Sequence, residues 1–313
     1  GDVDSAWKEC DIIVEGKTET GGQEHLYLET QGAIAIPEEG GKIKLISSTQ
    51  SPTSVQRTVS KVLSMPMNNI EVDVLRLGGA FGGKEDQATH WAVIAALAAT
   101  KLNKPVKLVL NRMDDMRMTG KRHPYSSDYK IGLTSQGKIL AFEATYFQNA
   151  GAVADLSPAV LDRTLFHAAN SYYIPNVKTT GISCKTNLPP NTAFRGFGGP
   201  QGKFVIEAAI YKAAEKMGVV PTVIQKNNLL KDGDTFYYGQ KVENSHAVNC
   251  WNESELLYDF KKAKNEVDEF NKNNYQFKKG IAVMPICFGI SFTNTFLNQA
   301  SALVHVYTDG SIG

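Results

Sequence analysis

The sequence predicts an α+β fold, in which mixed sheets pack against helices. Strand-like segments follow one another along much of the chain, and helical segments are interspersed among them. This mixture favours an α+β fold over a regular doubly wound sheet. Of the 313 residues, 42% are hydrophobic and 21% are charged, which is the composition of a packed protein and not of a disordered chain.

The first expected elements are a run of strands followed by a helix. Apolar residues alternate with polar ones, as is typical of strands, over residues 12–14, 26–36 and 43–46. Ser51 and Pro52 then supply a helix N-cap and a first-turn proline, and apolar residues recur at helical spacing as far as Leu63. A further strand is expected over residues 72–77.

A glycine-rich turn over residues 77–86 leads into the next helix. Residues 87–101 are apolar and rich in alanine, so the glycines lie between a strand and a helix. Further strands are expected over residues 106–110, 129–133 and 139–147. A helix is expected over residues 157–169.

A second glycine-rich turn, over residues 193–202, also opens a helical pattern, which covers residues 204–217. Residues 253–279 are polar and rich in lysine and asparagine, which indicates a solvated helix followed by a linker. A new apolar segment begins at Ile281.

The two glycine-rich turns suggest a site for an anionic cofactor. Glycine-rich approaches to helices expose backbone N–H groups that bind anionic or oxo ligands, so two such turns can clasp one large cofactor. Phe81 and Phe197 lie inside the glycine runs. A bulky aromatic on such a flexible turn is unfavourable unless it packs on a ligand or a core.

Neither turn matches a nucleotide-binding motif fully. Gly78, Gly83 and Lys84 have the spacing of a phosphate-binding loop, but Glu85 stands where the Mg²⁺-binding Ser or Thr belongs. Gln201 occupies the place of the last glycine of a dinucleotide fingerprint. A nucleotide-binding module that uses residues 78–84 remains the alternative from a different functional class.

Composition excludes several other partners. The net charge of +1 and the dispersed basic residues argue against nucleic acid. The most apolar run, residues 91–99, is shorter than the ~20 residues of a membrane-spanning helix, and residues 1–8 do not resemble a secretory signal, so a cytoplasmic location is expected. The four cysteines form no C-x-x-C pair, and no metal ligated directly by side chains is expected.

Arg163 is a candidate functional residue because it lies in the apolar helical stretch 161–166. A buried guanidinium is costly unless it is paired or faces a site, and pairing with Asp162 or another carboxylate is the structural alternative.

Together, these segments resemble the molybdopterin-binding part of the xanthine dehydrogenase and aldehyde oxidase family, and xanthine dehydrogenase most closely. The similarity lies in residues 21–30, 82–85, 185–189, 191–202 and 288–293, and these segments span nearly the whole chain. The resemblance implies a truncated α+β domain that binds the molybdenum cofactor. Residues 1–275 are expected to form the first molybdopterin-binding domain, and residues 276–313 a linker and the start of the second.

The resemblance also implies roles for individual residues. Gln23 would hydrogen-bond an oxo ligand of molybdenum, and the backbone at Phe81, Gly82 and Arg195 would touch the cofactor. The substrate-binding residues would be Phe197, Phe292 and Thr293.

Glu85 and Arg163 match the catalytic pair that grips opposite ends of a purine in the xanthine-oxidising members. A carboxyl can hydrogen-bond a purine, and a guanidinium can stabilise negative charge that develops on a ring oxygen. Aldehyde or another heterocycle is the alternative substrate within the family.

The reaction implied by the resemblance is the oxidation of hypoxanthine or xanthine to urate. A molybdenum-bound hydroxide would attack the ring carbon, hydride would pass to a Mo=S sulfur, and electrons would leave through 2Fe–2S clusters to FAD on other domains or subunits of an oligomeric enzyme. In the family, the glutamate base lies beyond the position of Gly313, so this chain alone is expected to be inactive.

Overall fold

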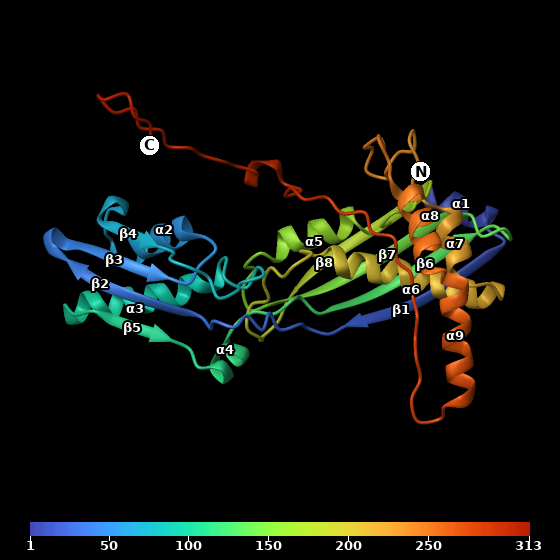
Figure 1. The fold of residues 1–313 in the computed structure, drawn as a ribbon, viewed down its shortest axis with the longest axis horizontal. Helices are drawn as coiled ribbons and strands as arrows, with labels where there is room; N and C mark the ends of the chain where they lie inside the picture. The colour runs from blue at the N-terminus through green and yellow to red at the C-terminus, as the bar shows by residue number, and fades with distance from the viewer.

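The computed structural model describes all 313 residues and contains two four-stranded sheets that lie end to end, each with its own helices (Figure 1). This architecture confirms the predicted α+β class. Within each sheet, one parallel pair of strands is connected through a helix, and the other neighbouring strands are antiparallel.

The first sheet has the strand order β4-β3-β2-β5, and helices α2 and α3 pack against it. Its strands are β2 (Gly32–Glu38), β3 (Lys42–Ser47), β4 (Ile70–Asp73) and β5 (Val106–Val109), and its helices are α2 (Pro52–Leu63) and α3 (Gln87–Leu102). Four alanines of α3 at helical spacing are fully buried: Ala92, Ala95, Ala96 and Ala99. Their small side chains let α3 lie close to the sheet.

The second sheet has the strand order β1-β6-β7-β8 and holds the larger hydrophobic core. Its strands are β1 (Ile12–Thr20), β6 (Tyr125–Leu133), β7 (Ile139–Gly151) and β8 (Asn176–Lys185). Helices α5 (Ser157–Phe166) and α6 (Gly199–Met217) pack on this sheet and on each other. Three ion pairs link neighbouring strands: Lys17–Asp128, Lys130–Glu15 and Lys178–Glu143.

The remaining helices are short or peripheral. They are α1 (Val3–Ala6), α4 (Arg112–Met118), α7 (Pro221–Asn227), α8 (Ala247–Tyr258) and α9 (Phe260–Asn273), with 3₁₀ turns η1 (Trp7–Glu9), η2 (Glu39–Gly41), η3 (Met67–Asn69) and η4 (Thr295–Leu297). After α9 the chain passes α5 and runs toward the end of the molecule that holds the first sheet (Figure 1). No helix has both the length and the apolar character that a membrane crossing requires.

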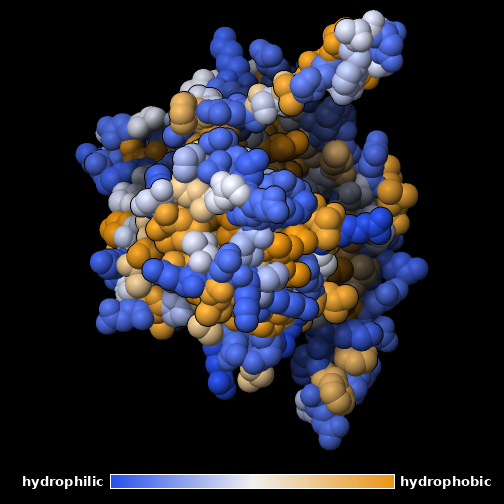
Figure 2. All heavy atoms as spheres, turned by 90° about the vertical axis from the view of Figure 1, so that its left-hand side faces the viewer, coloured by the Kyte–Doolittle hydropathy of each residue, from blue (hydrophilic) through white to orange (hydrophobic).

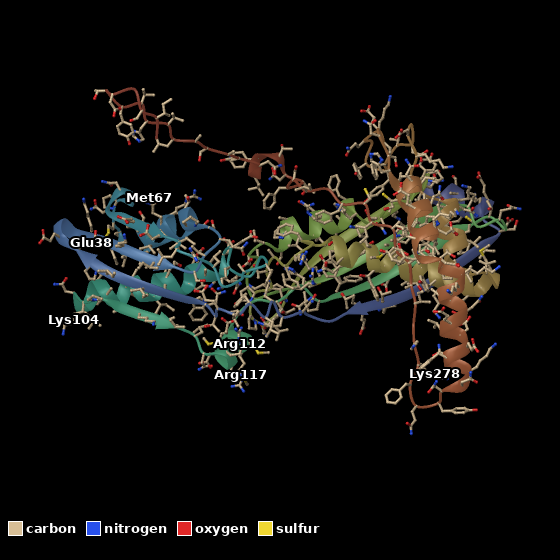
Figure 3. All side chains as sticks on the ribbon, viewed as in Figure 1. Glu38, Met67, Lys104, Arg112, Arg117 and Lys278 are labelled. Carbon is tan, nitrogen blue, oxygen red and sulfur yellow. The ribbon has the colours of Figure 1, made fainter.

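Side chains crowd the junction where the two sheet units meet (Figure 3). Arg112 of α4 lies at this junction, and its Nη2 donates to the carbonyl oxygens of Tyr27 and Leu28, at 2.5 and 2.8 Å. The outer end of the first unit mixes apolar with polar side chains (Figure 2). Its half-exposed apolar residues include Ile94, Leu97 and Val109.

Several predicted boundaries were wrong. The strand expected over residues 26–36 begins only at Gly32, because Leu26 has a φ of 48° and the preceding segment turns into the junction. The strand expected over residues 72–77 ends at Asp73, and the helix expected to reach residue 169 ends at Phe166. Helix α6 begins at Gly199, five residues before the expected start, because Pro200 fits its first turn.

Candidate functional site

The two glycine-rich turns, more than 100 residues apart in sequence, lie against each other at the junction. The Arg195 amide donates to the carbonyl oxygen of Phe81 at 3.0 Å. A Cβ on Gly82 would lie 2.8 Å from the carbonyl oxygen of Ala193, and Gly82 has a φ of +100° that other residues rarely adopt. Only a glycine therefore allows this approach of the two turns.

Both aromatic residues inside the glycine runs have left-handed backbone conformations. Phe81 has a φ of 55° and Phe197 a φ of 48°. Such a conformation costs a bulky residue roughly 1–2 kcal/mol, and strain of this kind is concentrated at functional sites. Phe81 is also half-exposed.

Arg122, which the sequence reading missed, connects Gln23 to the second turn. Its Nε donates to the Gln23 side-chain oxygen at 2.8 Å, and its Nη2 donates to the Arg195 carbonyl at 2.9 Å. The guanidinium lies 4.1 Å from the ring centre of Phe194, and burial lowers the pKa of Arg122 to about 10. Its Nη1 is buried without a hydrogen-bond partner. The site therefore contains an unused cationic donor.

Gln50 is a second residue that the sequence reading missed. Its side-chain oxygen accepts from the amides of Gly82 at 3.0 Å and Lys84 at 3.3 Å, and its Nε2 donates to no group of the chain. Gln50 therefore contacts the first turn directly, whereas the predicted Gln23 is held by Arg122. No motif surrounds Gln50, so only the fold shows this contact.

Lys84 points into the protein and away from the site. Its side chain is fully buried, and its Nζ donates to the Glu29 carbonyl at 2.8 Å and the Ser48 hydroxyl at 2.7 Å. It also pairs with the Glu29 carboxylate at 3.2 Å. The nucleotide-binding alternative was wrong, since the lysine that would bind the phosphates is already used inside the fold.

Glu85 is half-buried and makes no side-chain hydrogen bond or ion pair. Burial, together with the negative charges of Asp86 and Asp155, raises the pKa of its carboxyl to about 7. Near neutral pH this group can therefore either donate or accept a hydrogen bond.

Arg163 is buried in α5, and the structure contradicts its pairing with Asp162 or another carboxylate. Its guanidinium instead donates to backbone carbonyls of the extended segment after α9, at Gly289 and Ser291. Burial lowers the pKa of Arg163, and its Nε is buried without a partner. One donor of the guanidinium thus remains free.

Phe197 and Phe292 lie edge to face, with ring centres 5.4 Å apart and an interplanar angle of 87°. The Arg163 guanidinium lies 5.8 Å from the Phe197 ring centre. Thr293 follows Phe292 directly. The structure therefore brings together Arg163 and the aromatic residues predicted to bind substrate.

Lys203 adds a third cation to this region, and no sequence motif indicated it. It is 4% exposed, it has no hydrogen bond or ion pair, and its Nζ lies 4.8 Å from the ring centre of Phe288. Burial lowers the pKa of Lys203 to about 8. The His167 ring also lies against Phe288, tilted by 43°, with ring centres 5.1 Å apart.

The predicted residues form two clusters joined by the second turn. Gln23, Phe81, Gly82 and Arg195 belong to the cluster around Arg122, and Phe197 belongs to the cluster around Arg163. Arg195 and Phe197 are two residues apart, so one turn serves both clusters. No hydrogen bond or ion pair connects Glu85 to either cluster.

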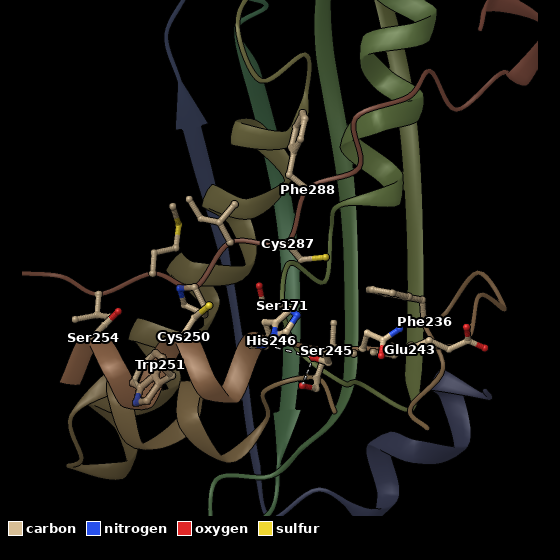
Figure 4. Close-up of a pocket in the computed structure, with 18 of the residues that line it drawn as sticks. Ser171, Phe236, Glu243, Ser245, His246, Cys250, Trp251, Ser254, Cys287 and Phe288 are labelled. Carbon is tan, nitrogen blue, oxygen red and sulfur yellow. Dashed lines mark hydrogen bonds between the residues drawn. The ribbon is translucent and has the colours of Figure 1, made fainter. Parts of the chain in front are cut away.

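A cavity of about 880 Å³ lies between α8 and the segment 283–288, and Phe288, whose ring also contacts Arg163 and Lys203, lines it (Figure 4). Trp251, His246 and Cys250 line it. None of the predicted site residues does.

Comparison with known proteins gives a consistent set of matches. A family model described as "Molybdopterin cofactor-binding domain" matches residues 1–229, and a second model with the same description matches residues 254–313. The chain is 46% identical over 313 residues to a xanthine dehydrogenase/oxidase of Gallus gallus and 44% identical over 315 residues to xanthine dehydrogenase 1 of Arabidopsis thaliana. It is covered completely in both cases, but it spans only 23% of each relative.

Solved structures share the fold at lower identity. The aldehyde oxidoreductase of Desulfovibrio gigas matches with a TM-score of 0.78 and 24% identity, over 88% of this chain and 30% of that one. Quinoline 2-oxidoreductase of Pseudomonas putida 86 matches with a TM-score of 0.78 and 22% identity, over 87% of this chain and 35% of that one.

Proposed function

The chain belongs to the molybdopterin cofactor-binding domain family, and from this premise we propose that it holds the cofactor and recognises purine in a xanthine dehydrogenase-like hydroxylase. The main support for the proposal is that the second turn contacts both the first turn and the Arg163 region. One end of it bonds to the first turn through Arg195, and two residues later it presents Phe197 beside Arg163. A cofactor at the turns would thus lie next to a substrate slot.

The unused donors at the junction fit an anionic cofactor. Arg122 Nη1 is buried and unpartnered, and Gln50 Nε2 is free beside the first turn. The backbone at Phe81, Gly82 and Arg195 would lie along the cofactor, and a side-chain amide from Gln23 or Gln50 would donate to an oxo group. The bound molybdenum cofactor supplies the oxygen for hydroxylation and accepts the electron pair.

The second cluster fits a flat ring that gains negative charge. Phe197 and Phe292 would hold the ring, and the Thr293 hydroxyl would lie nearby. The free Nε of Arg163 would donate to a ring oxygen and stabilise the charge that develops on it. Glu85, with its pKa near 7, would hydrogen-bond the opposite edge of a purine such as xanthine or hypoxanthine, with urate as the product.

An aldehyde or another heterocycle remains the second candidate substrate. The structures of aldehyde and quinoline oxidoreductases share the fold only, at 24% and 22% identity. A buried guanidinium with an unused donor favours a purine, because an aldehyde offers no ring oxygen at a distance from the reacting carbon.

The electron path would continue outside this chain. We place 2Fe–2S clusters and FAD on other domains or subunits of an oligomeric, cytoplasmic enzyme, because the chain spans 23% of its curated relatives and has no group of side chains arranged as metal ligands.

The test compares two substrates in the full-length enzyme. Arg163→Met should lower kcat/KM for xanthine on the order of 10²-fold or more, the usual loss of one charge-stabilising donor, and should leave oxidation of an aromatic aldehyde within a few-fold. Glu85→Gln should also lower kcat/KM for xanthine, but by a smaller factor.

Arg117→Met, on the exposed side of α4, is the matched control and should leave both activities unchanged. Equal losses on xanthine and aldehyde, or no loss on xanthine, would contradict the purine assignment.

A further inference from the structure

Asp155 lies where three segments that carry proposed substrate residues cross. It is half-buried directly before α5, and its φ of 47° places it in the left-handed region. Aspartate is one of the few residues that tolerate this conformation, but the conformation still costs free energy. Its presence here suggests that its carboxylate has a specific task.

The carboxylate of Asp155 bonds to all three segments. Its Oδ2 accepts from Gln87 Nε2 at 2.8 Å, and Gln87 follows Glu85 by two residues. Its Oδ1 accepts a hydrogen bond at 2.5 Å from the hydroxyl of Thr192, which leads into the second turn. The same oxygen accepts a hydrogen bond at 2.6 Å from the amide of Leu156, at the start of α5. These three segments carry Glu85, Phe197 and Arg163.

The amide of Gln87 is fixed in the orientation that this network needs. Its side-chain oxygen accepts from the Gly120 amide at 3.1 Å, so its Nε2 faces Asp155. Any residue larger than glycine at position 120 would collide with the carbonyl oxygen of Pro190, where a Cβ would be 2.2 Å away. The surrounding backbone therefore leaves the network little freedom to rearrange.

No cation neutralises the carboxylates in this region. Asp86, on the same segment, and Asp155, from the approach to α5, are the charged groups that act on Glu85, and neither forms an ion pair. Burial raises the pKa of both Asp155 and Glu85. Asp155 accepts three hydrogen bonds, which stabilise its anion, whereas Glu85 accepts none, so Glu85 is the more readily protonated of the two.

We propose that Asp155 is a positioning residue that fixes the spacing of Glu85, Arg163 and Phe197 and, through its charge, keeps the Glu85 carboxyl able to donate a hydrogen bond. The inference rests on the proposed function only where it names a purine as the acceptor of that bond. The protonation of Glu85 can be measured without any substrate.

Three variants of the full-length enzyme test this role. Asp155→Asn removes the charge and keeps the shape of the side chain. Asp155→Gly removes the charge and all side-chain hydrogen bonds, and it relieves the left-handed strain, so that at least one charge-deleted protein should fold. Asp162→Asn makes the same chemical change at an exposed position of α5 and serves as the control.

The first readout is an infrared titration of the protonated carboxyl band, assigned to Glu85 by its loss in Glu85→Gln. In the native protein the midpoint should lie at about 7, and in both Asp155 variants it should fall but stay above 4.5, because burial and the charge of Asp86 still raise the pKa of Glu85. Asp162→Asn should leave it unchanged. An unchanged midpoint in a folded Asp155 variant overturns the proposal.

The second readout is the pH profile of kcat/KM for xanthine. The protonated Glu85 is lost as pH rises through its pKa, so the alkaline limb should move to lower pH in both variants. At low pH, kcat/KM should fall on the order of 10²-fold in Asp155→Gly, because the substrate-binding residues are misplaced. In Asp155→Asn it should fall less than about tenfold. Equal low-pH losses would overturn the positioning role.

The two readouts separate this inference from the proposed function. A shifted infrared midpoint in an enzyme that does not oxidise xanthine would support the role of Asp155 and refute the purine assignment. An unshifted midpoint in an enzyme that does oxidise xanthine would refute Asp155 alone.

Discussion

At the residue scale, the site contains hydrogen-bond donors that no group of the chain uses. Arg122 Nη1 and Arg163 Nε are buried without partners, and each such group costs about 1–3 kcal/mol unless something outside the chain satisfies it. Gln50 Nε2 is also free. These donors point to ligands that the folded chain alone does not supply.

The two candidate glutamines can be distinguished by matched substitutions. Gln50 touches the first turn through Gly82, whereas Gln23 is bound to Arg122. Gln50→Ala should therefore lower activity of the full-length enzyme by about 10–100-fold, the usual effect of losing a neighbour of a metal site, and Gln23→Ala should have a smaller effect. Steady-state kinetics at equal molybdenum content would check this, and the reverse order would assign the oxo contact to Gln23.

Lys203 provides a stability test with a defined pH dependence. Its pKa in the folded protein is about 8, below the 10.5 of an exposed lysine, so the unfolded chain binds the extra proton and native stability rises as pH increases from about 8 to 10.5. Lys203→Met should stabilise the protein at pH 7 on the order of 2 kcal/mol and remove this rise.

Lys212→Met, at an exposed position of the same helix, is the control for this measurement and should change stability by less than about 0.5 kcal/mol. Denaturant unfolding at pH 7 and pH 10 measures the stability change of each variant and the rise of native stability with pH. A destabilised Lys203→Met variant would show that the ammonium has a stabilising partner.

The residues that sequence reading missed share a physical property. Arg122, Gln50, Lys203 and Asp155 act through hydrogen bonds or ring contacts to segments distant in sequence, and no local pattern surrounds them. Glu85, Arg163 and Phe197 could be selected because they stand in recognisable segments. Their roles remain predictions, although the structure places Arg163 beside Phe197.

At the scale of elements, the close contact of the two glycine-rich turns positions the site. Residues 81–82 and 193–195 touch through backbone atoms. The helices that follow, α3 and α6, are packed on different sheets. Each turn is thus anchored by the core of its own unit, and its backbone faces the other turn.

Gly82→Ala tests this contact. The new methyl group would lie 2.8 Å from the Ala193 carbonyl oxygen at a φ of +100°, so we expect a loss of stability of about 3 kcal/mol or more and loss of bound molybdenum. Gly40→Ala has a comparable left-handed backbone and open space around it, and it should cost only roughly 1 kcal/mol. Similar molybdenum contents in the two variants would show that the turns need not touch.

The helices with strong apolar periodicity were predicted well, and the irregular elements were not. Helices α2 and α3 lie within a residue of their expected bounds, because proline at the start of α2 and alanines along α3 are local signals. Strand β8 was not predicted, since its pairing with β7 is parallel and depends on the crossover through α5. Local patterns do not encode such pairing.

At the scale of the whole molecule, the site occupies the junction of two separately cored units. The unit around the first sheet contains Glu85 and the first turn, and the unit around the second sheet contains Arg163, Phe197 and the second turn. Ligand sites are common at such junctions, because two rigid units can present groups from distant parts of the chain. The α+β class was predictable from composition and pattern, but the end-to-end arrangement was not.

The segment after α9 contributes residues to the proposed substrate slot. It has little regular structure, yet it contributes Phe292 and the carbonyls of Gly289 and Ser291 that bind Arg163. The second family model covers this segment, so the slot combines residues matched by two molybdopterin cofactor-binding models.

The most direct test of this account is an experimental structure of the full-length, molybdenum-loaded protein with urate bound. We predict that the urate ring packs against Phe197 and Phe292 with Arg163 at its edge, and that molybdenum lies against Phe81, Gly82 and Arg195. Urate in the cavity beside Trp251, or metal remote from the two turns, would contradict the account.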